Sequence, residues 1–173
     1  VLPFLYFRVN YRIHEKKPLV SIIIPSRNNL KCLQQCIRSL MNKTDYNNYE
    51  VIIVDNNSDE PRTLEYLNEL RNVEGMVLTK YPEPFNFSAI NNKAIEEARG
   101  DFFLFLNDDT QIIHSDWLTE MVGIAIQENV GVVGARLWYP DGTLQHGGII
   151  LGINGSAGHS HKYFHKSCLL YTS

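Results

Sequence analysis

Cysteine is scarce in this sequence: Cys32, Cys36 and Cys168 are the only ones among 173 residues. Three thiols do not make the framework of a disulfide-stapled domain. Cys32 and Cys36 lie four positions apart on an expected helix and share one face, but no second ligand pair accompanies them, as a structural zinc site requires. We therefore expect ordinary half-buried thiols in a reducing compartment, and a cytoplasmic location.

Long hydrophobic runs and an excess of basic charge are also missing. No segment approaches the ~20 apolar residues that span a bilayer, and residues 1–9 lack the small-residue cleavage pattern of a signal peptide. The formal net charge of −3 argues against a nucleic-acid binder, which normally carries a basic face. Positive charge is concentrated in a basic and aromatic lead-in, residues 1–18. This segment predicts either a peripheral contact with anionic membrane lipid or a solvated arm.

Three common fingerprints of nucleotide and hydrolase chemistry are absent. No G-x-G-x-x-G follows the first apolar run, so the dinucleotide-binding motif is excluded. No G-x-x-x-x-G-K-[ST] occurs, which excludes a P-loop. No G-x-S-x-G occurs either, which excludes the usual hydrolase elbow.

What the sequence does contain is a regular alternation of short β-branched apolar runs and helix-patterned stretches. Continuous apolar runs are typical of parallel strands covered on both faces. The expected strands are 20–24, 49–54, 76–80, 101–106, 130–135 and 147–151. The expected helices are 30–41, 61–71, 88–99 and 115–127, with Ser88 and Ser115 as N-caps and Gly100 as a C-terminal stop. With 44% hydrophobic and 20% charged residues, the pattern predicts one α/β domain over 19–165, with a mostly parallel central sheet and flanking helices.

Acidic and amide side chains gather where the expected strands end, which is where open parallel sheets bind ligands. Asn107-Asp108-Asp109 directly follows an apolar run, and adjacent carboxylates repel unless a cation or hydrogen-bond donors offset them. Mg²⁺ or Mn²⁺ suits such a site, because it takes one or two carboxylates and fills its shell with water and phosphate oxygens. The alternative is a helix-capping acid with a solvated neighbour. Asp55 is a candidate to bind a base imide or ribose hydroxyl, or it forms an Asx-type turn after which Asp59 or Ser58 caps the next helix.

Histidines cluster near the end of the chain. His159, His161 and His165 have a metal-like spacing in a Gly- and Ser-rich stretch. A structural zinc ion normally has a fourth ligand and a closed geometry. We therefore favour loop histidines, and we keep His146, which follows an expected turn at 140–142, as a candidate on the acceptor side.

Four segments then follow one another in a distinctive order: VSIIIPSRNN at 20–29, YEVIIVDNNSD at 49–59, NKAIEEARG at 92–100 and DFFLFLNDDT at 101–110. Together they resemble the family 2 glycosyltransferases, whose fold is the Rossmann-like GT-A nucleotide-diphospho-sugar transferase fold. FNFSAINN at 85–92 and YPDGTLQHGG at 139–148 are similar to the rhamnosyltransferase branch of that family. The resemblance covers residues 19–160.

The resemblance implies a metal-dependent enzyme of polysaccharide biosynthesis. Such an enzyme transfers a hexosyl or rhamnosyl group from a nucleoside diphosphate to a hydroxyl of a glycan or lipid-linked glycan, usually with inversion. Asp109, as the last acid of the D-x-D-type motif, would bind Mg²⁺ or Mn²⁺. Asp108 would contact the ribose or the metal-bound diphosphate, and Asp55 would lie near the base. The residues that the resemblance assigns to the donor are Pro25, Ser26, Arg27, Asp55, Asn92 and Asp108.

The sequence departs from the family pattern in three places. Asn107 stands for the first acid of the D-x-D-type motif, and Ala94 stands for a glycine. The acceptor-side segment with the catalytic base is missing, so we assign no catalytic residue and expect the base beyond residue 173, with 166–173 as a non-native tail. The alternative hypothesis is therefore a non-catalytic fragment that binds the nucleotide sugar. A nucleotidyltransferase shares the fold and the metal, but the Gly-rich, Lys-bearing opening expected there is absent.

Overall fold

The computed structural model describes residues 9–13, 16–152 and 155–165. The chain divides into two units, Ile13–Thr119 and a second that combines Val1–Arg12 with Glu120–Ser173. None of the helices in the described ranges is long and apolar enough to cross a membrane. The tail at 166–173 lies outside the described residues, as does about half of the lead-in at 1–18, so the expectations for both stay predictions.

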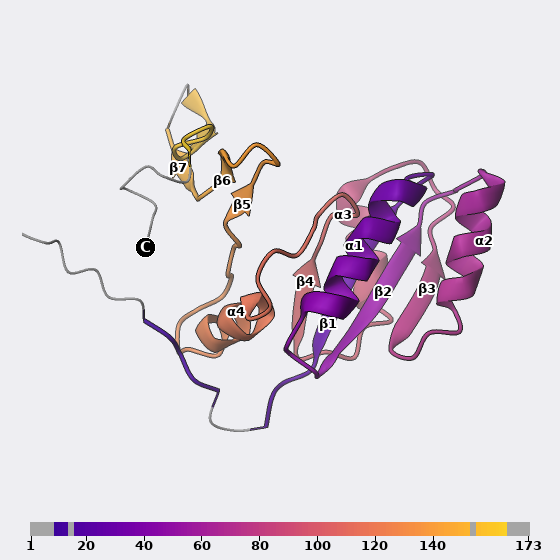
Figure 1. The fold of residues 1–173 in the computed structure, drawn as a ribbon, viewed down its shortest axis with the longest axis horizontal. Coiled ribbons are helices and arrows are strands. Elements are labelled where there is room, and N and C mark those ends of the chain that lie inside the picture. The colour runs from indigo at the N-terminus through magenta and orange to yellow at the C-terminus, as the bar shows by residue number, and fades with distance from the viewer. Residues whose placement is uncertain (1–8, 14–15, 153–154, 166–173) are drawn as a thin grey trace, which may run out of the picture. The chain divides into compact units, whose positions relative to one another are not determined.

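The first unit is built on a parallel sheet of four strands (Figure 1). The strands are β1 (Val20–Ser26), β2 (Tyr49–Asp55), β3 (Met76–Lys80) and β4 (Phe102–Phe105), in the order β3-β2-β1-β4. The chain therefore moves outward from β1 to β3 and then returns to the other side of β1. A crevice for ligands forms at such a switch point. The register places Ser26 beside Asp55 and Ile23 beside Phe105, so the carboxyl ends of β1, β2 and β4 lie together.

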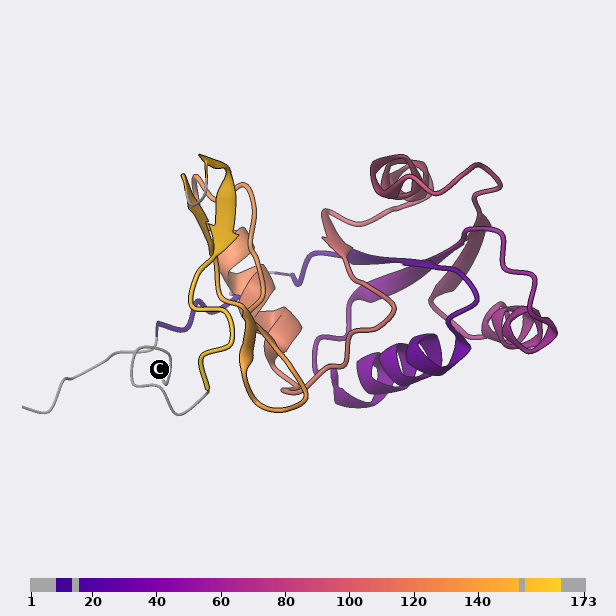
Figure 2. The same cartoon turned by 90° about the horizontal axis from the view of Figure 1, so that it is seen from above.

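Helices cover both faces of this sheet, which explains why the strands read as continuous apolar runs. Figure 2 shows α1 (Leu30–Lys43) and α2 (Pro61–Leu70) on one face and α3 (Phe87–Ile95) on the other. On the α3 side, Ile90 and Ala94 pack against strand side chains of β1 and β2. On the other side, α1 buries Leu33, Cys36, Ile37 and Leu40. The predicted α/β architecture is confirmed.

A buried hydrogen-bond network lies at the amino ends of the strands, opposite the crevice. Glu50 is 2% exposed and accepts the Ser21 hydroxyl at 2.7 Å and the Arg99 backbone N–H at 2.8 Å. The Arg99 guanidinium donates to its other oxygen at 2.6 and 2.9 Å. Gly100 donates its N–H to Ser21, and a Cβ at Gly100 would lie only 2.6 Å from the Ser21 nitrogen. The network holds the segment before β4 against β1 and β2.

The helix boundaries differ from the predicted ones where capping was misassigned. Asn86, not Ser88, caps α3, because its side chain accepts the Ala89 N–H at 3.1 Å. α3 ends at Ile95 rather than Arg99, so Gly100 is required for close approach to Ser21 and not as a helix stop. α4 (Trp117–Ala125) begins two residues after the predicted cap at Ser115.

The second unit contains two small antiparallel pairs instead of the longer strands expected there. β5 (Leu137–Trp138) pairs with β6 (Leu144–His146), and β7 (Ile149–Leu151) pairs with β8 (Ala157–His159). The strand predicted at 130–135 is wrong: the segment is irregular and Val132 is 92% exposed. Gly131 and Gly134 interrupt its valines, and glycine weakens a strand that has no pairing partner.

Candidate functional site

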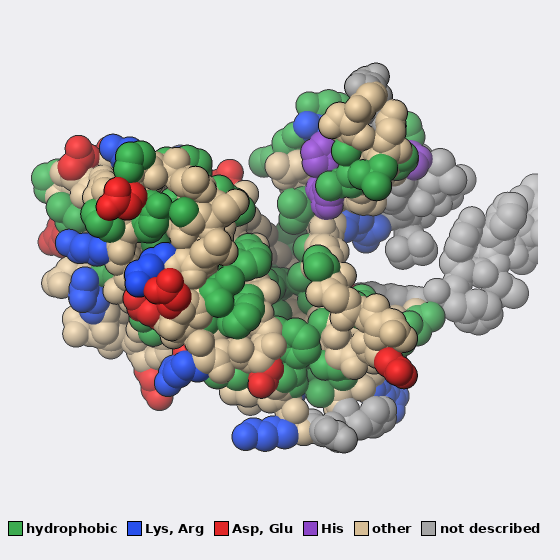
Figure 3. Space-filling view, turned by 180° about the vertical axis from the view of Figure 1, so that it is seen from behind, with side chains coloured by type: hydrophobic (Ala, Val, Ile, Leu, Met, Phe, Trp, Pro, Cys, Tyr) green, Lys and Arg blue, Asp and Glu red, His purple; other side chains and the backbone are tan. Residues whose placement is uncertain are grey.

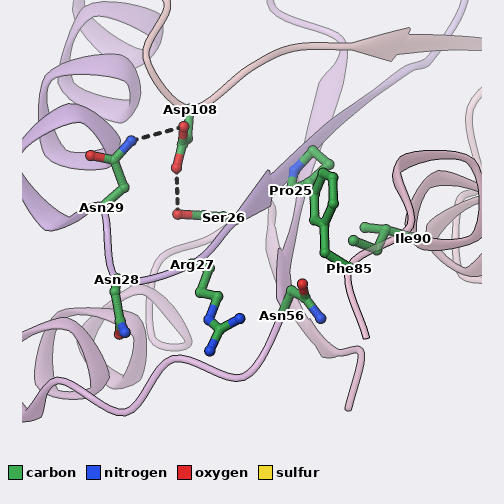
Figure 4. Close-up of a pocket in the computed structure, with 9 residues that line it drawn as sticks. All are labelled: Pro25, Ser26, Arg27, Asn28, Asn29, Asn56, Phe85, Ile90 and Asp108. Carbon is green, nitrogen blue, oxygen red and sulfur yellow. Dashed lines mark hydrogen bonds between the residues drawn. The ribbon is translucent and has the colours of Figure 1, made fainter. Parts of the chain in front are cut away.

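A pocket of about 400 Å³ lies at the switch point of the sheet (Figure 4). Residues at the ends of β1 and β2, in the loop after β4 and at the start of α3 form its walls. They are Pro25, Ser26, Arg27, Asn28, Asn29, Asn56, Phe85, Ile90 and Asp108. The lining combines an aromatic and an aliphatic side chain with hydroxyl, amide, guanidinium and carboxylate groups. Such a lining suits a ligand that has both a flat apolar face and polar groups.

Asp108 is held by two side chains from the β1 end of the pocket. The Ser26 hydroxyl donates to Asp108 Oδ2 at 2.7 Å, and the Asn29 amide donates to Asp108 Oδ1 at 3.0 Å (Figure 4). Each carboxylate oxygen therefore has a protein donor, which offsets part of its charge. Each oxygen also has a second lone pair, so Asp108 can still accept a hydrogen bond from a ligand.

Asp109 differs from Asp108 in its exposure and in its hydrogen bonds. It is exposed, and it makes no hydrogen bond or ion pair within the part of the chain that the structure describes. No group of three or more His, Cys, Asp or Glu in the described ranges forms a metal cage. One available carboxylate nevertheless fits Mg²⁺ or Mn²⁺, which takes one or two protein carboxylates and draws its other ligands from water and phosphate. The residues present therefore fit a cation that takes most of its ligands from water and phosphate.

Cys36 contacts the loop that carries the two acids. It is fully buried on α1, and its Sγ donates to the Asn107 carbonyl at 3.7 Å. Burial, with the negative charges of Asp108 and Asp109, raises the pKa of the thiol to about 12. Ser39, one turn further along α1, accepts the Ile112 N–H at 3.0 Å. The loop that carries Asp108 and Asp109 is thus fastened to α1 on both sides of the acids.

Asn56 forms the end of the pocket at β2, and its amide orientation is fixed. Its nitrogen donates both hydrogens, to the carbonyls of Tyr81 and Glu83, each at 2.9 Å. The side chain is 2% exposed, and its Oδ1 is buried without a hydrogen-bond partner. Buried polar atoms are almost always paired in folded proteins, so this acceptor, like Oδ1 of Asn91, is unusual among the described residues.

Asn28 joins the loop after β1 to the loop after β2. Its backbone adopts φ 50°, in the left-handed region where asparagine is tolerated better than most residues. Its side chain donates to Asp59 at 2.6 Å and accepts the N–H groups of Asp59 and Glu60 at 3.0 and 3.1 Å. These contacts hold the segment that leads into α2 against the end of β1. The prediction that Asp59 or Ser58 caps α2 is wrong, because Glu60 is the N-cap residue and no side chain makes a capping hydrogen bond to this helix.

The residues predicted to bind the donor divide into two groups. Pro25, Ser26, Arg27 and Asp108 line the pocket. Asp55 and Asn92 do not. Asp55 is 4% exposed, and its Oδ1 accepts the Ser58 N–H at 3.0 Å in the Asx-type turn. Asn92 is exposed on α3, whereas its neighbour Asn91 is buried. The donor-binding role of all six residues stays a prediction.

Sequence reasoning missed five pocket residues: Asn28, Asn29, Asn56, Phe85 and Ile90. Two signals were available. The pairs Asn28-Asn29 and Asn56-Asn57 directly follow strands, where asparagine favours turns and left-handed backbone. Phe85 lies in a turn-rich segment between two expected elements, where a large aromatic residue has no evident core to join.

The histidines of the second unit do not form a metal centre in the described residues. Figure 3 shows them gathered on this unit. His146 and His159 face each other, with their Nδ1 atoms 3.0 Å apart and their rings edge to face. His161 instead contacts the Ser160 hydroxyl and packs edge-on against Phe164. The contact between His146 and His159 joins β6 to β8.

Comparison with known proteins shows a family match over most of the chain. The model of glycosyl transferase family 2 matches residues 21–166. The uncharacterized protein y4gI of Sinorhizobium fredii is 45% identical over 148 residues, which is 85% of this chain and 16% of that protein. The O-antigen biosynthesis protein RfbC of Myxococcus xanthus is 40% identical over 153 residues, or 88% of this chain and 12% of that protein. The chain thus spans less than a fifth of the length of either relative.

Solved structures share the fold. The mannosyltransferase PcManGT from Pyrobaculum calidifontis, solved with GDP-Man and Mn²⁺, superimposes with a TM-score of 0.63 at 22% identity, over 73% of this chain and 37% of that one. S. aureus TarS 1–349, solved with UDP, gives a TM-score of 0.51 at 26% identity, over 61% of this chain and 31% of that one. The fold is therefore GT-A-like.

Proposed function

This chain belongs to glycosyl transferase family 2, and we propose that it is the donor-binding domain of an enzyme that transfers a sugar from a nucleoside diphosphate to an acceptor hydroxyl. The transferred sugar is of hexosyl or rhamnosyl type, and transfer proceeds with inversion. The acceptor is a glycan or lipid-linked glycan of a polysaccharide pathway, which the similarity to an O-antigen biosynthesis protein supports.

The observation that carries this proposal is the division between Asp108 and Asp109. Asp108 is fixed inside the pocket by Ser26 and Asn29. Asp109, the next residue along the chain, is exposed with its carboxylate available. A nucleoside diphosphate matches this arrangement, because its nucleoside needs an enclosed polar pocket and its diphosphate needs a cation at the rim. Either acid alone would be an ordinary loop residue.

The chain's own residues supply binding and orientation. Arg27 brings an exposed positive charge to the pocket wall, where the diphosphate would pass. Asp108 accepts a ribose hydroxyl through a lone pair that Ser26 and Asn29 leave available. Asp109 holds the cation. When bound, that cation would stabilise the negative charge that develops on the leaving diphosphate.

Calorimetry on this chain tests the proposal. UDP, dTDP and GDP are titrated with and without Mn²⁺ or Mg²⁺. We expect at least one of them to bind, and to bind about tenfold or more tightly with the cation, because the metal links Asp109 to the phosphates. Asp109→Asn removes the metal enhancement and keeps the metal-free affinity. Glu65→Gln, an exposed carboxylate on α2, is the matched control and changes neither. The absence of any nucleoside diphosphate binding, with or without metal, refutes the proposal.

The alternative, a fragment that binds the donor without transferring it, concerns catalysis and not binding. It is favoured for the isolated chain because none of the described residues is assigned as the catalytic base. The full-length protein separates the two. Sugar transfer by that protein, lost in Asp109→Asn and kept in Glu65→Gln, assigns the donor half of an enzyme to this chain. Donor binding without transfer or donor hydrolysis in the full-length protein assigns a binding domain.

A further inference from the structure

A second hollow lies along the exposed side of α1, and we call it the α1 groove. Its volume is about 230 Å³, and it is lined by Gln35, Arg38, Ser39, Asn42, Lys43 and Gln111. None of these residues lines the pocket at the switch point of the sheet. We propose that the α1 groove binds a phosphate group, either free or carried by a sugar, with Arg38 as its main contact.

Helical periodicity brings the α1 residues of the groove together. Gln35, Ser39 and Lys43 follow one another at intervals of four residues, and Arg38 and Asn42 are also four apart. Both series therefore lie on one side of the helix, since residues four apart are neighbours on its surface. The residues that α1 buries against the sheet lie on the opposite side. The groove thus does not compete with the packing of the first unit.

The loop after β4 forms the other wall. Gln111 donates its side-chain N–H to Gln35 Oε1 at 3.0 Å, and the Ile112 N–H donates to the Ser39 hydroxyl at 3.0 Å. Figure 2 shows this part of the chain, between β4 and α4, passing beside α1. Two hydrogen bonds therefore hold the wall in place, and a ligand in the groove would contact the loop that carries Asp108 and Asp109.

Every charged residue that lines the groove is positive. Arg38 and Lys43 are exposed, and neither side chain makes a hydrogen bond or ion pair within the described residues. Lys43 belongs to the last turn of α1, where its charge also complements the carbonyl ends of the helix. Arg38 lies more than a turn earlier, so the helix end does not account for its charge. It is the cation that remains available to a ligand.

The uncharged lining adds hydrogen-bond donors. Gln35 uses its oxygen to accept from Gln111, so its NH₂ group is the end that stays available. The Asn42 amide has no hydrogen-bond partner among the described residues. A hollow that offers N–H groups and two positive charges, without a carboxylate in its lining, suits an oxyanion.

Phosphate is the oxyanion that fits these groups best. It carries a charge of about −1.5 to −2 at neutral pH and has three or more acceptor oxygens, whereas a carboxylate has two and a single charge. The planar guanidinium of Arg38 can bind two of those oxygens at once. The groove is smaller than the pockets that take drug-sized ligands, so it suits a phosphate that carries one sugar.

NMR titration of side-chain amides tests the inference on this chain without added metal. Inorganic phosphate and glucose 1-phosphate are the probes, and glucose is the uncharged control. We expect both phosphates to shift the NH₂ signals of Gln35, Asn42 and Gln111, with a Kd on the order of 1 mM, and glucose to shift none of them. Asn68, exposed on α2, should not respond. About 0.5 M NaCl should weaken binding severalfold, because it screens exposed charges.

Variants assign the binding to the cations of α1. Arg38→Gln should weaken phosphate binding about tenfold, which is the loss of one charge-assisted contact. Arg38→Lys should lie between the wild type and Arg38→Gln, because it keeps the charge and loses the planar fork. Lys43→Gln should weaken binding about threefold. Arg62→Gln, which removes an exposed charge from α2, is the matched control and should leave the Kd unchanged.

The side chains replaced are exposed, so the variants should fold, and the remaining amide signals verify this. An unchanged Kd in Arg38→Gln overturns the inference. Shifts confined to Asn28, Asn29 and Asn56 also overturn it, because they place the phosphate in the pocket at the switch point. Equal shifts with glucose would indicate a site for neutral sugar. Flotation with vesicles that contain phosphatidic acid is the last arm, and binding to vesicles without binding of either soluble phosphate contradicts a small-molecule site.

Discussion

The hydroxyl of Ser26 donates to the carboxylate of Asp108 at 2.7 Å, across 82 positions of sequence. This bond joins the end of β1 to the loop after β4 at the switch point of the sheet. It requires that the two strand ends stay together, which the parallel pairing of β1 with β4 ensures. Asp108 is thereby held inside the pocket, while the neighbouring Asp109 is exposed and is the carboxylate that we propose for the cation. The bond thus distinguishes two adjacent acids.

A double-mutant cycle on unfolding measures that bond. Ser26→Ala and Asp108→Ala each remove it, so their effects on the free energy of unfolding should not add. We expect a coupling of about 1 kcal/mol, typical of residues that share a hydrogen bond. The pair Ser26→Ala and Asp109→Ala is the control. Asp109 makes no contact with Ser26, so those effects should add to within ~0.5 kcal/mol. Urea denaturation of the wild type, the three single variants and the two double variants gives the six free energies of unfolding. Additivity in the cycle of Ser26 and Asp108 would contradict the hydrogen bond between them.

Gly100→Ala is expected to destabilise the first unit. The new Cβ would lie 2.6 Å from the Ser21 nitrogen and 2.9 Å from the Phe102 carbonyl oxygen, both backbone atoms that cannot move aside without disturbing β1 or β4. Overpacking of this kind costs about 1–3 kcal/mol. Gly131→Ala, where a Cβ would meet nothing within 4 Å, is the control and should be neutral. Thermal unfolding compares the two, and an unchanged midpoint for Gly100→Ala would rule out the steric explanation.

The sequence was sufficient to predict the sheet and the place of the site. Val20–Ile24 and Tyr49–Val54 carry unbroken β-branched runs, and covering such strands on both faces leaves few arrangements other than a parallel sheet. Once the sheet is parallel, its carboxyl ends meet at one edge. The polar residues that follow each run must then be neighbours. Asp108 was placed at this edge in this way, whereas Pro25, Ser26 and Arg27 were assigned to the donor by the family resemblance.

What the sequence could not predict depends on contacts between loops. The orientation of the Asn56 amide is fixed by the carbonyls of Tyr81 and Glu83, and nothing in the local sequence pattern predicts those contacts. The contacts of Asn28 with the N–H groups of Asp59 and Glu60 likewise come from another loop, whereas local rules favoured Asp59 or Ser58 as a cap that α2 lacks. The strand predicted at 130–135 failed for the opposite reason. Its valines fit a strand locally, but no strand in the described residues pairs with them.

Acid should remove a specific part of the stability of the first unit. Burial raises the pKa of Glu50, but hydrogen bonds from the Arg99 N–H, the Ser21 hydroxyl and the Arg99 guanidinium outweigh it, so the pKa lies below its ordinary value of 4.5. A carboxyl with a lowered pKa in the folded state stabilises the fold above its unfolded-state pKa and loses this contribution as the pH falls through the folded-state value.

Urea denaturation between pH 6 and pH 3 tests this expectation with Glu50→Gln. The variant should be less stable than the wild type at pH 6, and the gap should narrow as the pH falls below about 4.5, because protonated Glu50 resembles the amide. Glu65→Gln, which lies exposed on α2, should show a small and constant difference. A gap for Glu50→Gln that does not change with pH would contradict the prediction.

Cys32 and Cys36 should differ sharply in reactivity although they share one helix face. Cys36 is fully buried and the pKa of its thiol is raised to about 12, whereas Cys32 is partly exposed. Thiolate is the species that alkylating reagents attack, and a pKa three units above the ordinary 9.0 lowers its fraction roughly a thousandfold. Iodoacetamide at pH 8 should therefore label Cys32 and spare Cys36 in the folded protein, and should label both in urea. Both cysteines fall on the tryptic peptide Cys32–Arg38, so fragmentation in the mass spectrometer assigns the label.

The same labelling reports on the loop that carries Asp108 and Asp109. Since Cys36 is hydrogen-bonded to the Asn107 carbonyl, its labelling in the folded state would mean that this loop opens. Protection that increases with Mn²⁺ and a bound nucleoside diphosphate would show that the donor closes that loop.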